Sequence, residues 1–503
     1  MNKQPDRSVR IAIDLGAESG RVLLVWLDAA DGSPGWQEVH RFSNRILTLP
    51  GGLHWNISGI WQEILDGLRA AARQAASGDL QIRSVGVDCW GVDWCLLDEH
   101  GELLGLPHAY RDPRNEDSFV QVSSELPPRE LYRLTGIQVM QINSLFSLRA
   151  MATASPQLMR AARRLLFLPD LIHYWLSGRQ INEATIASTG QLMEADTGHW
   201  SGQLLQIAGL SPGCVTDPLP PATVLGPLQS AVAEATELPA GVEVILPASH
   251  DTASAIAAVP ADPETEWCFI SSGTWSLLGA EIPRPCLNDQ AARYMFTNER
   301  GVAGTVRFLK NIAGLWLIQQ CRRDFAIRDP GQQFDYEQLT ELAHRAEPFR
   351  TLLDPDNPAF GRPGHFLEKI DTWATESGQP LPQTPGDYLR CCLESLAIKY
   401  RLTLDRLERV LDRRFEVIHV VGGGSNNRLL CQMTADATGR TVVAGPAEAT
   451  AIGNGLVQAI GDGQIRDLTE LRAIVRQSGT AAVYQPRADE SWGRQAERLS
   501  ALA

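Results

Sequence analysis

The segment that first indicates how this chain folds is Arg10-Ile11-Ala12-Ile13-Asp14-Leu15-Gly16-Ala17-Glu18-Ser19-Gly20-Arg21-Val22-Leu23-Leu24-Val25-Trp26. Two apolar runs flank a polar turn that contains two glycines, a pattern that predicts a β-hairpin. Glycines allow successive N–H groups of the turn to point at one phosphate, and Ser19 adds a hydroxyl donor. Asp14, at the end of the first strand, is placed to hold Mg²⁺ directly or through water. An ordinary glycine turn is the alternative interpretation.

A second hairpin of the same kind is expected in the middle of the chain. Its strands would be 268–271 and 275–279, and its turn is Ser272-Gly273-Thr274. Each hairpin has a glycine and a hydroxyl residue at its turn and opens one half of the chain, so we infer a weak internal repeat. Two such turns facing across a cleft could grip one polyphosphate from both sides.

Strands and helices alternate in both halves of the chain. Apolar runs predict buried strands at 84–88, 242–246 and 417–421, and helical spacing of apolar residues predicts helices at about 58–76 and 387–411. This alternation predicts an α/β architecture.

A length of 503 residues is too great for one ordinary core and predicts two domains. The best boundary lies at 260–264, where prolines and charged residues separate apolar segments. We therefore expect an N-terminal domain at 1–257, a C-terminal domain at 258–503, and a cleft between them.

The composition is that of a soluble globular protein, with 44% hydrophobic and 21% charged residues. A formal net charge of −14 repels nucleic-acid backbones and anionic membranes, so neither is expected as a partner. Nine scattered cysteines without a C-x-x-C pair are typical of reduced thiols and not of a zinc site. No signal-peptide pattern and no membrane-spanning apolar run occur, so we expect a cytoplasmic protein. Its oligomeric state, monomer or weak dimer, stays open.

The segment Ser249-His250-Asp251-Thr252 contains the carboxylate that best suits a chemical role. It follows a predicted buried strand, and ligands of α/β sheets collect at such strand ends. Phosphoryl transfer needs a carboxylate near the attacking hydroxyl, and Asp251 can serve with an ordinary pKa because the alcohol loses its proton late. The alternative is that Ser249, Asp251 or Thr252 only caps the next helix.

Two more segments have residues suited to ligands. Asp88-Cys89-Trp90-Gly91-Val92-Asp93-Trp94 combines carboxylates with aromatic rings on which a sugar could stack, although both tryptophans could equally be core. Segment 420–427 places three glycines between a strand and a helix, a layout that receives a nucleotide; a tight turn is the alternative. It is not a dinucleotide fingerprint, because Asn427 stands where a glycine is needed. No P-loop and no protein-kinase catalytic loop occurs in the sequence.

Taken together, these segments resemble one family, the FGGY carbohydrate kinases. The similarity follows the family's order over almost the whole chain. It is carried by residues 13–21, 88–93, 110–112, 168–170, 248–253, 271–278, 309–312 and 421–427. The motif Ser-Gly-Thr-Trp-Ser-Leu at 272–277 is similar to the branch of the family that acts on L-rhamnulose.

The resemblance implies an actin-like (ribonuclease H-like) fold in each domain, with sugar bound mainly by the N-terminal domain and nucleotide mainly by the C-terminal domain. It implies ATP-dependent phosphorylation of L-rhamnulose at O1, with Mg²⁺ required, as a step of L-rhamnose breakdown. Asp251 is similar to the family's general base. The implied ATP contacts are Ala17, Glu18, Ser19, Gly20, Arg21, Thr274, Gln319 and Gly423. The implied sugar contacts are Gly91, His250, Asp251, Thr252 and Asn311.

Glu18 departs from the family pattern, which often has Ser or Thr at this position. A carboxylate there repels phosphate unless it points outward or acts through Mg²⁺, and Arg21 could offset it. Three other functions stay open. They are a kinase for another ketose such as L-fuculose, a nucleotide-gated sugar sensor without turnover, and an NAD-dependent oxidoreductase.

Overall fold

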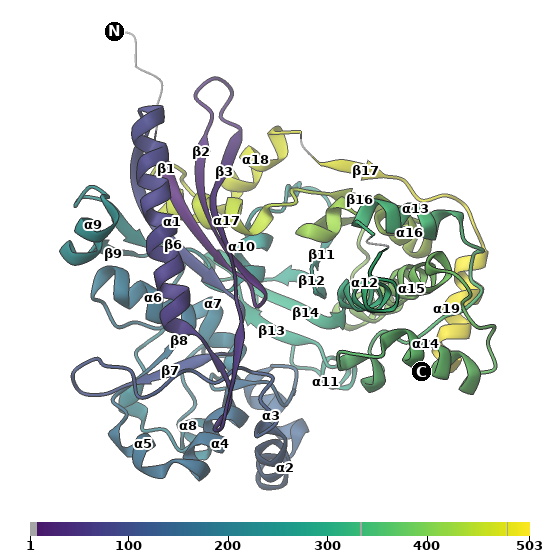
Figure 1. Cartoon of the computed structure of the whole chain (residues 1–503), viewed down its shortest axis with the longest axis horizontal. Coiled ribbons are helices and arrows are strands. Elements are labelled where there is room, and N and C mark those ends of the chain that lie inside the picture. The colour runs from purple at the N-terminus through teal and green to yellow at the C-terminus, as the bar shows by residue number, and fades with distance from the viewer. Residues whose placement is uncertain (1–7, 332–333, 480, 503) are drawn as a thin grey trace. The chain divides into compact units, whose positions relative to one another are not determined.

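A computed structural model describes residues 8–331, 334–479 and 481–502. The remaining residues include 1–7, so most of the polar N-terminal stretch lies outside the described part. The chain forms two compact units (Figure 1). The first unit comprises Met1–Pro260, Glu281–Phe308 and Ala449–Gly479, and the second comprises Ala261–Ala280, Leu309–Glu448 and Thr480–Ala503. Each unit contains a sheet and helices, so the predicted α/β class is confirmed.

The first unit is built on a six-stranded sheet with the order β3-β2-β1-β6-β10-β9. Its strands are β1 (Ser8–Leu15), β2 (Ser19–Leu27), β3 (Pro34–Ser43), β6 (Gln81–Cys89), β9 (Val224–Pro227) and β10 (Glu243–Ile245). The predicted hairpin is formed by β1 and β2, which pair antiparallel, and β3 continues the meander. On the other side of β1, strands β6 and β10 run parallel to it, and β9 closes the edge antiparallel.

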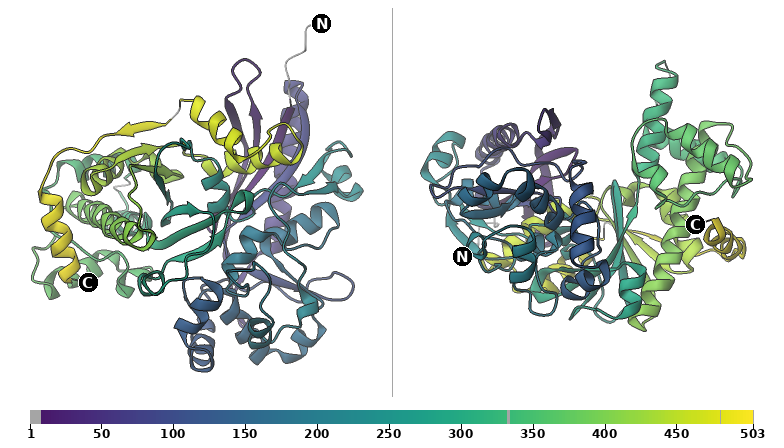
Figure 2. Two further views of the ribbon diagram at one scale, coloured as in Figure 1. Left: turned by 180° about the vertical axis from the view of Figure 1, so that it is seen from behind. Right: turned by 90° about the horizontal axis from the view of Figure 1, so that it is seen from below.

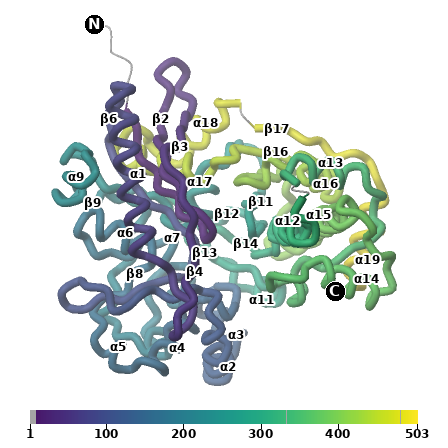
Figure 3. Tube along the Cα trace, in the orientation of Figure 1, coloured from purple at the N-terminus to yellow at the C-terminus, as the bar shows by residue number. Residues whose placement is uncertain are grey.

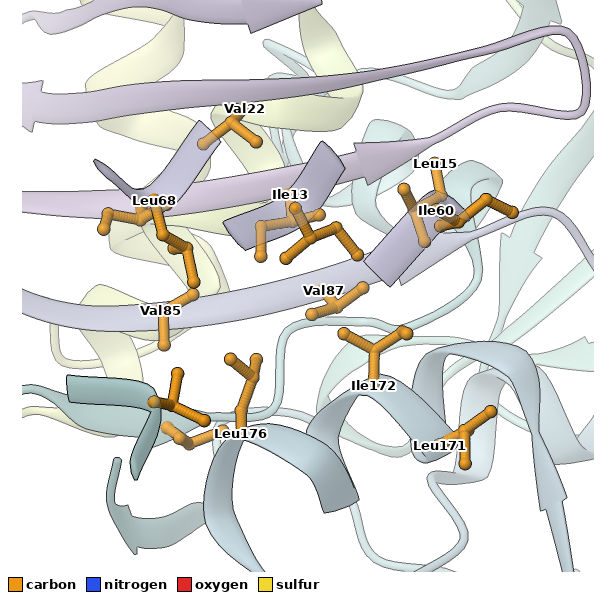
Figure 4. Packing of buried hydrophobic residues seen from close by; sticks show 14 of the residues in the cluster. Ile13, Leu15, Val22, Ile60, Leu68, Val85, Val87, Leu171, Ile172 and Leu176 are labelled. Carbon is orange, nitrogen blue, oxygen red and sulfur yellow. The ribbon is translucent and has the colours of Figure 1, made fainter. Parts of the chain in front are cut away.

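Side chains of this sheet alternate between two faces, as the pleat of a β-strand requires. One face, which includes Ile13, packs with α1 (Ile57–Gly78) and α6 (Leu168–Ser177) in a single hydrophobic cluster (Figure 4). The other face presents residues such as Val25 to α17 (Ala449–Gly461). Each large apolar side chain buried in this way contributes about 1.5–3 kcal/mol.

Residues 449–479, near the C-terminal end of the sequence, belong to the first unit because helix α17 packs on its sheet. A Cβ at Gly455 would lie 2.6 Å from the Val25 side chain, so glycine permits the close approach of helix and sheet. Figure 2, in the view from behind, shows the yellow helices α17 and α18 (Leu468–Gln477) beside the purple strands of this unit.

The predicted helix at 58–76 is confirmed as α1, which runs along the sheet in Figure 1. It begins after Asn56, whose side chain accepts a hydrogen bond from the backbone N–H of Gly59 and so satisfies a donor that the first turn leaves open. The other elements of the first unit surround this sheet. They are β4 (Ile46–Leu49), β5 (Gly52–Trp55), β7 (Trp94–Leu97), β8 (Arg164–Phe167), α2 (Asn115–Glu125), α3 (Pro128–Thr135), α4 (Ser144–Ala154), α5 (Pro156–Ala161), α7 (Ala184–Ala187), α8 (Gly202–Ile207), α9 (Ser230–Thr236), α10 (Asp251–Ala257), α11 (Asp289–Tyr294) and β13 (Thr297–Arg300).

A seven-stranded sheet has the order β13-β14-β12-β11-β15-β16-β17. Its further strands are β11 (Trp267–Ser272), β12 (Trp275–Ile282), β14 (Val306–Ala313), β15 (Val417–Val421), β16 (Thr441–Ala444) and β17 (Ala482–Tyr484). The boundary between the units crosses β12 and β14. Strand β11 pairs antiparallel with β12 and parallel with β15, and β15 pairs parallel with β16. The same hairpin-then-parallel arrangement therefore occurs in both sheets, which confirms the predicted internal repeat.

The long helix predicted at 387–411 is α15 (Pro385–Leu411), which begins with a capping box between Thr384 and Asp387. The other helices of the second unit are α12 (Trp316–Arg328), α13 (Tyr336–Arg345), α14 (Phe366–Glu376), α16 (Arg428–Thr438) and α19 (Ser491–Leu502). In Figure 3 the chain can be followed from β16 through α17 and α18 of the first unit and back to β17. None of the helices in the described ranges is both long enough and apolar enough to span a bilayer.

Candidate active site

The turn of the first hairpin is held in shape by hydrogen bonds to its backbone. Gly16 N donates to Ser19 O at 2.9 Å, and Asn44 donates from its backbone N to Glu18 O at 2.9 Å and from Nδ2 to Gly16 O at 2.6 Å. The backbone N–H groups of Ala17 and Glu18 donate to no acceptor in the described part of the chain. The turn thus keeps two adjacent donors for an anion.

The charged side chains at this turn differ in how far they are exposed to solvent. Glu18 is exposed, so its carboxylate can point away from the turn. Arg21, which follows Gly20 in β2, forms an ion pair with Asp14. Both side chains are largely buried. Gly20 itself lies under Phe42, because a Cβ at this position would come within 2.2 Å of the ring. Close packing therefore requires glycine at position 20 whatever ligand the turn holds.

Asp251 is the first residue of α10, close after the end of strand β10. Its Oδ1 accepts hydrogen bonds from the backbone N–H and the Oγ1 of Thr252. Its Oδ2 accepts none from the described chain, and 34% of its side-chain surface is accessible. The capping interpretation is thus partly right, since one oxygen contacts the first helical turn while the other stays available to a reactant.

The electrostatic surroundings of Asp251 include two more aspartates at the same end of the sheet. Burial, followed by the charge of Asp14, raises the pKa of Asp251 to about 6. Burial, and again the charge of Asp14, raises the pKa of Asp88 well above its ordinary value. Asp88 faces Asp14 in the register of β6 and β1. No group of three or more His, Cys, Asp or Glu side chains in the described ranges is arranged to hold a metal by itself.

Besides Asp251 itself, three of the five residues implied as sugar contacts lie near this carboxylate. Gly91 is close to His250, since a Cβ there would lie 3.1 Å from the His250 Nε2. Cys89 N donates to Ser249 O at 2.9 Å and so joins the end of β6 to the segment before α10. Thr252 contacts Asp251 directly. The fifth residue, Asn311, lies on β14 in the second unit.

The two tryptophans that follow Asp88 are core residues. Trp90 is 6% exposed and its Nε1 donates to Asp93, while Trp94 is 7% exposed and its Nε1 donates to Ser147 Oγ at 2.7 Å. Each side chain belongs to a hydrophobic cluster. Their rings therefore serve packing, and Gly91 is the residue of this segment that borders Asp251 and His250.

A buried scaffold that the sequence did not reveal positions the segment before Asp251. Glu183 caps α7 by accepting hydrogen bonds from Thr185 and from the backbone N–H of Ile186, and it also accepts one from Ser249 N at 3.3 Å. Thr185 Oγ1 in turn accepts a hydrogen bond from His250 N at 3.1 Å. No sequence pattern relates residues 183–185 to residues 249–250. The sequence therefore did not predict that Glu183 and Thr185 hold the segment before Asp251.

Two of the three residues implied as nucleotide contacts in the second unit, Thr274 and Gln319, contact each other. Gln319 Nε2 lies 3.4 Å from Thr274 Oγ1, and the backbone of the Gly273-Thr274 turn accepts hydrogen bonds from the start of α12. The glycine turn after β15 packs on the end of β11, because a Cβ at Gly424 would lie 2.0 Å from Ser272 Oγ. Gly423 is exposed, and a Cβ there would meet no atom within 4 Å.

Comparison with known proteins identifies the class to which this fold and site belong. Residues 9–257 match the N-terminal domain of the FGGY family of carbohydrate kinases, and residues 268–461 match its C-terminal domain. The chain belongs to the FGGY family of carbohydrate kinases. It is therefore a phosphotransferase that acts on a sugar with ATP.

The most similar relatives include two curated bacterial proteins. The chain is 40% identical to the rhamnulokinase of Bacteroides thetaiotaomicron over 96% of both chains. It is 39% identical to the rhamnulokinase of Oceanobacillus iheyensis over 94% of this chain and 97% of the relative. The crystal structure of the xylulose kinase from Rhodospirillum rubrum has a TM-score of 0.78 at 20% identity, with 98% of this chain and 97% of that chain covered. The actin-like fold predicted for both domains is thereby confirmed.

Proposed function

We propose that this kinase transfers the γ-phosphoryl group of ATP to O1 of L-rhamnulose and forms L-rhamnulose 1-phosphate. The shared name of its full-length relatives supports the substrate. The observation that carries the chemistry is the open Oδ2 of Asp251 at the start of α10. The reaction would serve L-rhamnose breakdown in the cytoplasm.

Asp251 is our candidate for the general base. A carboxylate with a pKa of about 6 is ionised at neutral pH and accepts a proton more readily than an ordinary aspartate. Because the acceptor alcohol loses its proton late in a loose transition state, such a carboxylate suffices. Oδ1, held by Thr252, orients the group, and Oδ2 receives the proton.

We propose two sets of candidate contacts to the phosphates of ATP, one in each unit. In the first unit they are the free N–H groups of Ala17 and Glu18, with Ser19, Gly20 and Arg21 beside them. In the second unit they are Thr274, Gln319 and Gly423. The accessible backbone of Gly423 supports a nucleotide beside it, since no side chain fills that space.

Mg²⁺ is expected to accompany ATP, and Asp14 is the protein group that we propose for it. Magnesium keeps several waters and is bound through one or two carboxylates plus phosphate oxygens, so a complete protein cage is unnecessary. The carboxylate of Asp14 faces Asp88 across the strands and pairs with Arg21, at the end of the sheet where Asp251 also lies. When bound, the metal would neutralise charge on the transferred phosphoryl group.

A panel of ketoses tests the proposal. L-rhamnulose, L-fuculose, L-ribulose and D-xylulose are each incubated with ATP and Mg²⁺, and ADP release is measured. We expect the highest kcat/KM with L-rhamnulose, and phosphorus NMR should locate the new ester at O1. A higher value with L-fuculose would assign the enzyme to that ketose. Tight sugar and ATP binding without ADP release would instead favour a sensor.

A further inference from the structure

A buried arginine lies behind the histidine of the candidate sugar site. Arg307 is on β14 within the first unit, and its side chain is 1% exposed. Its Nη1 lies 2.9 Å from His250 Nδ1 and 3.1 Å from Glu299 Oε2, and its Nε donates to Arg300 O at 3.0 Å. Neither the sequence motifs nor the proposed chemistry accounts for such a costly buried charge.

This contact determines which nitrogen of His250 carries the proton. A guanidinium group has only donors and stays protonated, so an imidazole nitrogen in hydrogen-bond contact with it must accept. Nδ1 of His250 therefore bears a lone pair, and a neutral ring then has its hydrogen on Nε2. The ring is neutral because burial, and next the charge of Arg307, lowers the pKa of His250 well below its usual value.

Among the described residues, Arg307 is the only group within hydrogen-bond distance of His250 Nδ1. Glu299 Oε2, which could accept a proton from Nδ1, lies 3.7 Å away and already pairs with Arg307. The backbone N–H of His250 donates a hydrogen bond to Thr185 Oγ1, so both the backbone and the ring of this residue are held in place.

The Nε2 atom of His250 faces the region beside Asp251. It lies 3.6 Å from Asp251 Oδ1, too far for a direct hydrogen bond, and 3.1 Å from where a Cβ of Gly91 would be. It donates to no acceptor in the part of the chain that the structure describes. An N–H donor and a carboxylate acceptor thus lie side by side.

We propose that Arg307 is a positioning residue that locks His250 in the neutral Nε2–H form, so that His250 donates a hydrogen bond to the substrate oxygen next to the hydroxyl that reacts at Asp251. This proposal rests on the proposed kinase function and defines its substrate class more closely. The acceptor should have an oxygen with a lone pair on the carbon beside the phosphorylated one, as a 2-ketose has in its carbonyl or hemiketal oxygen. A sugar that lacks this oxygen leaves the Nε2–H without a partner and loses binding.

Nitrogen NMR on the intact protein tests the lock without any turnover. The chain is labelled with ¹⁵N-histidine, and the resonances of His250 are assigned by comparison with His250→Gln. We expect a protonated Nε2 and an unprotonated Nδ1 from pH 8 down to pH 5. An Nδ1–H tautomer or an imidazolium ring in this range would overturn the proposal. Because no sugar or ATP is present, this outcome is independent of whether the ketose panel succeeds.

A matched pair of variants then separates positioning from packing. Arg307→Gln/Glu299→Gln keeps an N–H donor for Nδ1 and avoids an unpaired Glu299, whereas Arg307→Met/Glu299→Gln removes the donor at similar size. We expect the methionine variant to lower kcat/KM for the ketose about tenfold to hundredfold, with KM for ATP within twofold, and the glutamine variant to recover most of this loss. Equal activity of the two folded variants would contradict the lock, and if the methionine variant does not fold, the NMR result on the wild-type protein decides.

Discussion

Asn454 Nδ2 donates a hydrogen bond of 2.6 Å to Asp88 Oδ2, although 366 residues separate the two in the sequence. Both side chains are completely buried. The contact continues through Gln458, which donates to Asn454 Oδ1 and to the backbone oxygen of Ile11 in β1. A segment from the end of the chain thereby satisfies polar groups in the first sheet, next to the aspartates of the candidate site.

Replacing this amide tests how much the returning helix stabilises the first unit. Asn454→Leu removes the donor and leaves the buried Asp88 without a partner for Oδ2, so we expect a loss of about 1–3 kcal/mol in unfolding free energy. Urea denaturation followed by circular dichroism measures it. Thr469→Ala, on the exposed surface of α18, is the control and should change stability by less than about 0.5 kcal/mol. A loss no larger than that of the control would mean that the amide is dispensable.

The general-base role is tested by Asp251→Asn, which keeps the shape of the side chain and removes its ability to take a proton. We expect kcat to fall by roughly 10²–10⁴ while ATP still binds. Steady-state kinetics and calorimetry measure the two quantities. Asp262→Asn, at an exposed position, is the control and should leave both unchanged. Near-normal turnover of Asp251→Asn would remove this residue from its proposed role.

The pH dependence of the reaction follows from the raised pKa of Asp251. A base works only in its ionised form, so kcat/KM for the sugar should fall about tenfold per pH unit below the pKa of about 6 and level off above it. An ordinary aspartate would keep the rate constant down to about pH 4. The profile is measured with saturating ATP and a pH-independent coupling assay. A plateau that extends below pH 5 would show that Asp251 does not titrate as described.

Much of the fold could be predicted because local patterns determine it. Continuous apolar runs located β1, β6 and β15, and the glycine turns located both hairpins. The return of α17 to the first unit could not be predicted, since an apolar helix gives no indication of which sheet it covers. The close approach of α17 to this sheet depends on the small Gly455 beside Val25. These two residues are more than 400 positions apart in the sequence.

The candidate site was predictable to the extent that its residues lie in motifs. Asp251 and Gly91 stand at strand ends, where the sequence itself indicates ligands. Arg307 lies inside the apolar run Val306-Arg307-Phe308-Leu309. A charged residue in such a run indicates a buried partner, and the sequence offered no other indication. That the partner is His250 follows only from tertiary structure. The division of sugar and nucleotide binding between residues 1–257 and 258–503 stays a prediction.

The second hairpin is tested by Thr274→Ala, which removes the hydroxyl that contacts Gln319. If Thr274 holds a phosphate of ATP, the dissociation constant for ATP should rise about threefold to tenfold, as expected for one lost hydrogen bond, while sugar binding changes little. Calorimetry with each ligand measures both constants. Thr274→Ser keeps the hydroxyl and is the matched control. A larger effect on sugar than on ATP would mean that this turn has another role.

The exposed Glu18 offers a substitution that should improve nucleotide binding. Its carboxylate stands in a turn whose free N–H groups we assign to phosphate, so it repels ATP through solvent. For an assumed separation of about 6–8 Å in water, one unit charge contributes about 0.5–0.7 kcal/mol, and Glu18→Ser should lower KM for ATP about twofold to threefold. The gain should largely vanish in 0.5 M salt, which screens exposed charges. Glu99→Ser, another exposed carboxylate outside the turn, is the control. A rise in KM with Glu18→Ser would show instead that the carboxylate assists ATP, as it would by acting through Mg²⁺.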